Sequence, residues 1–139
     1  MTEVVDASVV VKWVLAEAGR EASLTLLNAY EAGAADLIAP RTLMDEVASA
    51  LSKRCRRGQI NTKQASAAFA FLEQRTPILI HNNRLVREAL DLSLLHHLSL
   101  WDCLYLALAI RYRCDLTTAD HRFYRAAQKH YPFVVLLGS

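Results

Sequence analysis

Five short apolar runs, separated by helical segments, constrain the fold of this 139-residue chain more than any other feature. The runs are residues 3–5, 36–39, 77–80, 116–117 and 133–137. A strand with one solvated face alternates polar and apolar residues. These runs do not alternate, so we expect a parallel sheet with both faces covered. The pattern predicts an α/β fold, a three-layer α/β/α sandwich around a central, mostly parallel, five-stranded sheet.

The segments that accompany these runs have the spacing and punctuation of helices. They are residues 8–15, 20–32, 42–57, 62–74, 84–97, 100–113 and 121–130. The segment 42–57 has Thr42 as a cap at its start and Gly58 just beyond its end. No linker or repeat interrupts the alternation, and 139 residues is the length of one domain. We therefore expect a single domain over residues 1–139.

Composition and charge exclude several classes of protein. The chain is 53% hydrophobic and carries a net charge of +2, which excludes a disordered chain and a histone-like polycation. Cys55, Cys103 and Cys114 are odd in number and far apart, which favours free thiols in a reducing compartment. The first residues lack a signal-peptide pattern, and the longest apolar run, residues 103–110, is too short to span a membrane. We expect a cytoplasmic protein.

Acidic residues stand where the predicted strands pass into helices. Asp6 follows the first strand directly, and Asp120 follows the fourth after a two-residue link. Glu46 lies near the start of the helix that follows the second strand. In sheets of this kind, ligands bind beyond the carboxyl ends of the strands. Asp102 opens a helix that follows another helix, so local geometry places it at this edge less securely.

Helical spacing distinguishes Glu46 from its neighbour Asp45. Asp45 shares a polar, solvated face with Ser52 and Arg56. It also stands three residues after Thr42, where a capping-box role is enough to explain it. Glu46 lies at the margin of the apolar face. We therefore take Glu46 as the candidate site residue.

Each candidate acid also has a purely structural explanation. Asp6 and Asp120 are in position to cap the helices that follow them, and Asp102 stands three residues after Ser99, as in a capping box. Ser, Thr or Asn would serve equally well as caps, yet several junctions on one sheet edge carry an acid. Clustered carboxylates destabilise a fold unless a cation neutralises them. The pattern alone leaves both helix caps and a carboxylate metal site open.

Three blocks of the sequence resemble the signature blocks of PIN-domain ribonucleases, and most closely those of VapC-type toxins from toxin–antitoxin pairs. The blocks are VVDASVVVKWVL, PRTLMDEVASAL and LSLWDCLYLALAIRYRCDLTTADHRF. They occur in the family's order and span nearly the whole chain. Asp6 with Ser8, Glu46, Asp102 and Asp120 match the acidic positions of the family. One departure is Ser49, where many members carry Asn.

The resemblance implies a Mg²⁺- or Mn²⁺-dependent endoribonuclease, a hydrolase that cleaves RNA with a metal-activated water. Mg²⁺ uses only one or two direct carboxylates and keeps several waters. We assign Asp6 and Asp102 as direct ligands, with Glu46 and Asp120 completing the site through water or a second ion. We expect hydrogen bonds from Ser8, Thr118 and Ser49 to support these acids.

RNA binding requires cationic side chains near the site, because phosphate contacts dominate affinity. Lys12 follows Ser8 by one helical turn, and Arg122 follows Asp120. Lys53 and Arg54 belong to a basic cluster at the end of the 42–57 helix. These four residues are the predicted RNA contacts. The alternative for the cluster is complementation of the helix dipole, and Lys12 and Arg122 have the alternative of pairing with acids.

The aromatic and histidine residues receive structural interpretations. Trp13, Trp101 and Tyr105 are expected in the core or at a subunit contact rather than as base-stacking platforms. His96 and His97 are adjacent on a helix, so they point about 100° apart and do not form a metal pair. We expect them at the surface or at the helix end.

Three hypotheses for function remain at this stage. The leading one is a ribonuclease toxin, held inactive by a small antitoxin and forming a homodimer. The second is the same chemistry in RNA processing or decay without an antitoxin. The third is a PIN-like binding module without turnover, against which the intact acid set argues. A short reading frame just upstream that encodes a DNA-binding antitoxin would favour the first over the second.

Overall fold

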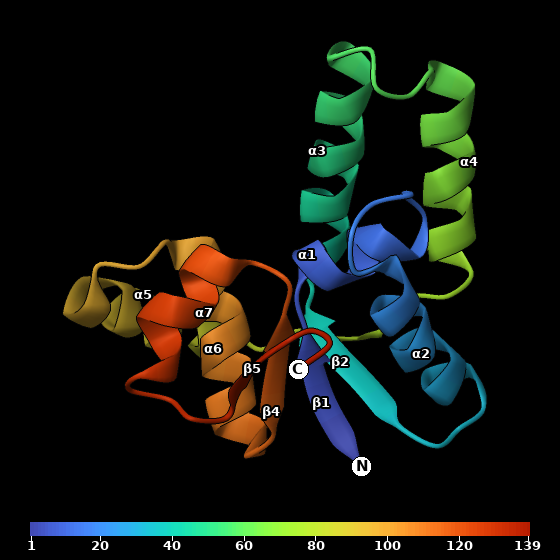
Figure 1. Cartoon of the computed structure of the whole chain (residues 1–139). Helices are drawn as coiled ribbons and strands as arrows, with labels where there is room; N and C mark the ends of the chain where they lie inside the picture. The colour runs from blue at the N-terminus through green and yellow to red at the C-terminus, as the bar shows by residue number, and fades with distance from the viewer.

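A single parallel sheet of five strands forms the centre of the computed structural model, which describes residues 1–139 (Figure 1). The strands are β1 (Thr2–Val5), β2 (Asp36–Pro40), β3 (Ile78–Ile80), β4 (Asp115–Thr118) and β5 (Val134–Leu136). Their order in the sheet is β3-β2-β1-β4-β5, and every neighbouring pair is parallel. The predicted five-stranded α/β fold is confirmed.

Seven α-helices and one short 3-10 helix connect and cover the strands. They are α1 (Ala7–Val10), η1 (Val11–Trp13), α2 (Arg20–Glu31), α3 (Leu43–Arg56), α4 (Thr62–Glu73), α5 (Asn83–His96), α6 (Leu100–Tyr112) and α7 (His121–Gln128). Helix α6 packs on β1, β2 and β4, and α5 packs on α6. Figure 1 shows α3 and α4 side by side, rising beyond the end of the sheet where α1 begins.

Helix α6 has no polar face because it lies between the sheet and α5. Its seven consecutive residues Cys103, Leu104, Tyr105, Leu106, Ala107, Leu108 and Ala109 are all buried. A helix that is apolar all round is a buried helix, as this one is. The helix starts where the Ser99 hydroxyl accepts a hydrogen bond from the Asp102 backbone N–H, at 3.1 Å. The expected cap at Ser99 is confirmed.

The start of α3 differs from the prediction. Thr42 was expected to cap this helix, in a capping box with Asp45, but its side chain makes no capping hydrogen bond. Thr42 has helical dihedral angles (φ −76°, ψ −6°), whereas a capping side chain requires an extended backbone. The turn after Pro40 imposes this conformation, and the Thr42 hydroxyl is left buried without a hydrogen-bond partner.

The structure bears on two expectations drawn from the composition, those for the cysteines and for membrane-spanning helices. Cys55, Cys103 and Cys114 are free thiols. No single helix is both long enough and apolar enough to cross a membrane. Helices α5 and α6 taken together have the length and apolar composition of a membrane-spanning segment, but the chain bends by 114° between them.

The central strands set the position of the candidate acids. β1 lies between β2 and β4, so the chain reverses its direction of travel across the sheet at β1. Val5 is in register with Thr117 on β4, which places the next residues, Asp6 and Thr118, side by side. The carboxyl ends of strands at such a reversal are where α/β proteins bind ligands.

Candidate active site

Asp6 is a buried carboxylate held by three hydrogen bonds. It is 5% exposed and stands between β1 and α1. The Ser8 hydroxyl donates to Asp6 Oδ1 at 2.5 Å, and the Thr118 hydroxyl donates to Oδ2 at 2.5 Å. The Val9 N–H also donates to Oδ1, at 3.3 Å, so Asp6 caps α1 as the structural alternative expected. Both carboxylate oxygens are therefore oriented by the surrounding backbone and hydroxyls.

The same two hydroxyls connect Asp6 to the start of α7. The Ser8 hydroxyl accepts from the Ala119 N–H at 2.9 Å, and the Thr118 hydroxyl accepts from the Asp120 N–H at 3.1 Å. Asp120 in turn caps α7, because its Oδ1 accepts from the Phe123 N–H at 3.1 Å. Ser8 and Thr118 thus form hydrogen bonds with Asp6 and with the backbone at the start of α7, as expected of residues that support the acids.

Glu46 is joined to α6 through Tyr105. The Tyr105 hydroxyl donates to Glu46 Oε2 at 2.6 Å, across 59 residues of sequence. Tyr105 is 1% exposed, so its core position is confirmed. Its contact with Glu46 was missed at the level of sequence. The available signal was a hydroxyl within an otherwise apolar buried helix, because a buried tyrosine hydroxyl needs a hydrogen-bond partner.

The charges of neighbouring candidate acids act on one another. The pKa of Asp6 is raised to about 6, chiefly by burial and in smaller part by the charge of Asp102, while the hydrogen bonds from Ser8 and Thr118 lower it. Burial likewise raises the pKa of Glu46 to about 7, with the charges of Asp6 and Asp102 acting in the same direction.

Asp102 connects this pair to Asp120. Burial raises the pKa of Asp102, and the charge of Asp120 raises it as well. The Ser99 hydroxyl accepts from the backbone N–H of Asp102, which lies in the first turn of α6. The packing of α6 on the central strands, rather than any local pattern, brings Asp102 to the other acids.

No basic side chain neutralises these acids. The ion pairs of the structure use Glu17, Glu31, Glu88 and Asp91 as their acidic members. Asp6, Glu46, Asp102 and Asp120 are absent from that set. Asp120 is exposed, but Asp6 is buried and Glu46 and Asp102 are partly buried, and carboxylates so placed without a counter-charge are costly to the fold. The site therefore has the electrostatic character of a cation-binding site.

The oxygen donors fit a hard divalent cation such as Mg²⁺ or Mn²⁺. No three His, Cys, Asp or Glu side chains lie close enough together to enclose one ion as a purely protein cage. This spacing suits a cation that takes one or two direct carboxylates and reaches the others through water. The direct-ligand roles of Asp6 and Asp102 remain predictions.

The predicted basic contacts divide into two groups. Lys12 and Arg54 both pair with Glu17, Lys12 at 3.0 Å, so these two cations share one carboxylate. The sequence does not predict this role of Glu17, because Arg54 of α3 lies 37 residues further along the chain. Lys53 and Arg122 are exposed and form no ion pair.

Ser49 and Trp101 lie around a hollow beside Glu46. Ser49 is exposed on α3 and makes no side-chain hydrogen bond, so its supporting role stays a prediction. Trp101 is 54% exposed, so the core position considered for it is wrong in the folded chain. Trp101 precedes the buried stretch of α6, which runs from Cys103 to Ala109. Trp13, by contrast, is buried.

The histidine cluster lies at the end of α5. The ring nitrogen Nε2 of His96 is 2.8 Å from the Tyr131 hydroxyl, and the His96 ring stacks on His130. His97 ends α5 in a left-handed conformation, with a φ of 55°. The helix-end position expected for both residues is confirmed.

A parallel α/β sheet with unpaired carboxylates at its carboxyl edge defines the protein as an α/β domain with an acidic site. The PIN domain family model matches residues 4–129, which is most of the chain. The chain therefore belongs to the PIN domain family. No curated protein matches the chain at the level of sequence.

Solved structures with a similar fold include the following two. One is VapC20 of Mycobacterium tuberculosis, described as a toxin that cleaves the sarcin-ricin loop. It is 17% identical, with a TM-score of 0.66, over 89% of this chain and 94% of that chain. The other is PAE2754 from Pyrobaculum aerophilum, also 17% identical. Its TM-score is 0.71, over 99% of this chain and 92% of that chain.

Proposed function

We propose that this protein is a metal-dependent endoribonuclease that hydrolyses RNA phosphodiester bonds. The observation that carries the proposal is the group of four coupled acids without a basic partner at the carboxyl edge of a PIN-domain sheet. RNA cleavage by the structurally similar VapC20 supports RNA as the substrate class.

The residues of the site divide the work. Mg²⁺ or Mn²⁺, when bound, supplies a water of lowered pKa and stabilises charge on phosphate oxygens. Asp6 and Asp102 are the proposed direct ligands, and Asp120 and Glu46 would complete the site through water or a second ion. The hydroxyls on both oxygens of Asp6 keep that carboxylate in one orientation. The Tyr105 hydroxyl does the same for Glu46 and leaves its Oε1 free of hydrogen bonds.

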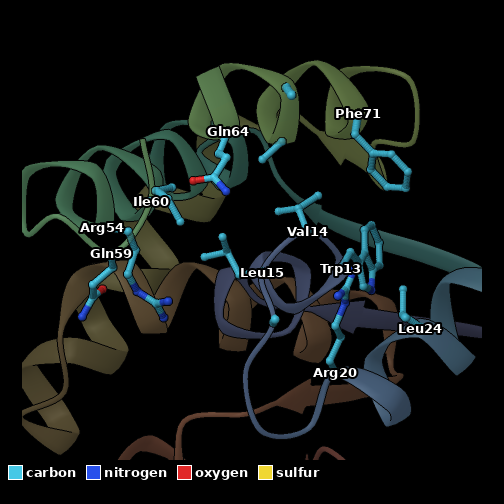
Figure 2. A pocket seen from close by; sticks show the side chains of 13 residues that line it. Trp13, Val14, Leu15, Arg20, Leu24, Arg54, Gln59, Ile60, Gln64 and Phe71 are labelled. Carbon is cyan, nitrogen blue, oxygen red and sulfur yellow. The ribbon is translucent and has the colours of Figure 1, made fainter. Parts of the chain in front are cut away.

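We propose further that the nuclease is a cytoplasmic toxin controlled by a small antitoxin. The similarity to VapC20 supports the toxin role. A groove of about 780 Å³, lined by residues of η1, α2, α3 and α4, is the candidate site for the antitoxin. Figure 2 shows Val14 and Leu15 facing α4 across this groove, with Arg54 toward one end and Phe71 toward the other. A groove of this kind suits an apolar segment that carries acidic residues.

The proposed homodimer has a candidate contact on α5. Val86, Leu90 and Leu94 follow one another at four-residue spacing, and all three are exposed. Residues at this spacing lie on one face of a helix. A second copy of the chain would bury this stripe.

Cleavage assays with matched variants test the nuclease proposal. Purified protein is incubated with structured RNA in Mg²⁺, in Mn²⁺ and in EDTA, alongside Asp6→Asn, Asp102→Asn and the control Asp36→Asn, which changes an exposed acid at the amino end of β2. We expect cleavage only with metal, and a loss in the two site variants of at least the roughly 10–100-fold that follows removal of a residue supporting a metal site. Asp36→Asn should cleave like the wild type. Cleavage in EDTA, or undiminished cleavage by Asp6→Asn, would contradict the proposal.

A further inference from the structure

Trp101 is a large aromatic side chain exposed directly beside the acidic site. It is 54% exposed and immediately precedes Asp102 in the first turn of α6. It lines a hollow of about 550 Å³ that it shares with Glu46 and Lys53 of α3 and with Ala7, the residue after Asp6. A single exposed aromatic residue needs no explanation by itself. The position of Trp101 in one hollow with the Glu46 carboxylate and with Lys53, which forms no ion pair, indicates a binding role.

The lining of the hollow supplies three different kinds of contact. The indole face of Trp101 is a flat apolar surface, on which a nucleobase can stack whatever its identity. The Lys53 ammonium group is exposed and has no acidic partner, so it is available to a phosphate. Glu46 connects the hollow to the acids proposed to act on the scissile phosphate. The small Ala7 and Ala50 side chains leave the space between the two walls open.

We propose that this hollow binds an unpaired nucleobase next to the scissile phosphate, stacked on Trp101, while Lys53 contacts the neighbouring phosphate. The inference rests on the proposed ribonuclease function and specifies its substrate. A base inside a duplex has no free face for Trp101, so the site selects nucleotides in loops, bulges or single strands. The flanking base is held by stacking, so its identity matters less than its being unpaired.

Tryptophan fluorescence reads this contact directly. The chain has two tryptophans, and Trp13 is 1% exposed with its indole N–H bonded to the Ser23 carbonyl, so a ligand-induced change reports Trp101. The probe is a single-stranded hexaribonucleotide, added in Mg²⁺ to the Asp6→Asn protein, whose proposed cleavage is disabled. We expect the hexaribonucleotide to quench the emission and a fully paired duplex of the same sequence to leave it unchanged. Equal quenching by both, or by neither, overturns the proposal.

Affinity and turnover of variants give the second measurement. Trp101→Ala should weaken binding of the labelled hexaribonucleotide by roughly 5- to 150-fold, and Trp101→Phe should keep most of the affinity. The matched control is Tyr112→Ala, an aromatic residue 46% exposed at the other end of α6, which should bind like its parent. In otherwise wild-type protein, Trp101→Ala should raise KM for a looped RNA more than it lowers kcat.

The outcomes separate this inference from the proposed function. Metal-dependent cleavage by the wild type, with unchanged affinity and KM in Trp101→Ala, overturns the role of Trp101 and leaves the nuclease intact. Quenching by the hexaribonucleotide without cleavage by the wild type supports the base site and overturns the nuclease. A Trp101→Ala protein that sediments as a smaller species, with RNA affinity unchanged, shows a subunit contact and overturns the base site.

Discussion

Replacing Asp6 by Asn should make the metal-free protein more stable at neutral pH, although it removes a central site residue. Burial raises the pKa of Asp6 from 3.8 to about 6, so the folded protein binds this proton more tightly than the unfolded chain does. The contribution of the Asp6 carboxyl group to the free energy of unfolding is therefore most favourable below about pH 4. It is lost as the pH rises through about 6. The neutral amide does not carry that cost.

The size of the effect follows from the same pKa and from the hydrogen bonds. A rise from 3.8 to about 6 corresponds to about 3 kcal/mol at pH 8. The amide NH₂ cannot accept a hydrogen bond as the carboxylate does from Ser8 or Thr118, which costs about 1–1.5 kcal/mol. The net gain is about 1.5–2 kcal/mol, or about 6–8 °C in Tm for a chain of this length.

Thermal unfolding at two pH values, with and without Mg²⁺, tests this prediction. In EDTA at pH 8, Asp6→Asn should melt above the wild type. At pH 4 the gain should vanish, because the wild-type carboxyl is then protonated in the folded state. Mg²⁺ should raise the Tm of the wild type and not of the variant. The exposed control Asp36→Asn, at the amino end of β2, should follow the wild type throughout.

Two results would refute the reasoning. A variant that melts below the wild type in EDTA at pH 8 would mean that the Asp6 charge is compensated in the folded protein. An equal gain at pH 4 and pH 8 would mean that the gain does not come from the charge.

Two further predictions concern Glu46 and the metal. Tyr105→Phe removes the hydrogen bond that lowers the pKa of Glu46. The variant should lose about 1 kcal/mol of stability in urea unfolding and bind Mn²⁺ more weakly at pH 7. A loss of stability with unchanged Mn²⁺ affinity would show that Tyr105 does not act on the metal site. The stabilisation by Mg²⁺ should grow as the pH rises from 5.5 to 8, since protons compete for Asp6 and Glu46 with pKa values of about 6 and 7. A Tm increase independent of pH would place the metal elsewhere.

Local sequence was sufficient for the strands, the helices and the edge positions of three acids. Asp6 and Asp120 stand at strand-to-helix junctions, and such junctions are visible in the apolar runs and caps themselves. The choice of Glu46 over Asp45 also needed only helical spacing, since one side chain lies at the margin of the core and the other is exposed. At Thr42 the same local reasoning failed, because a cap depends on backbone angles that the preceding turn sets.

The sequence by itself thus determined a single α/β domain, its PIN-type blocks and the residue types available for an acidic site. Only the tertiary structure decided that Asp102 joins the other acids, that Tyr105 holds Glu46, and that Trp101 is exposed beside them. The physical reason is range. Caps and helical faces depend on residues a few positions apart, whereas the Tyr105–Glu46 and Thr118–Asp6 hydrogen bonds join residues 59 and 112 positions apart. Contacts of that separation exist only after α6 has packed on the sheet and β4 has paired with β1.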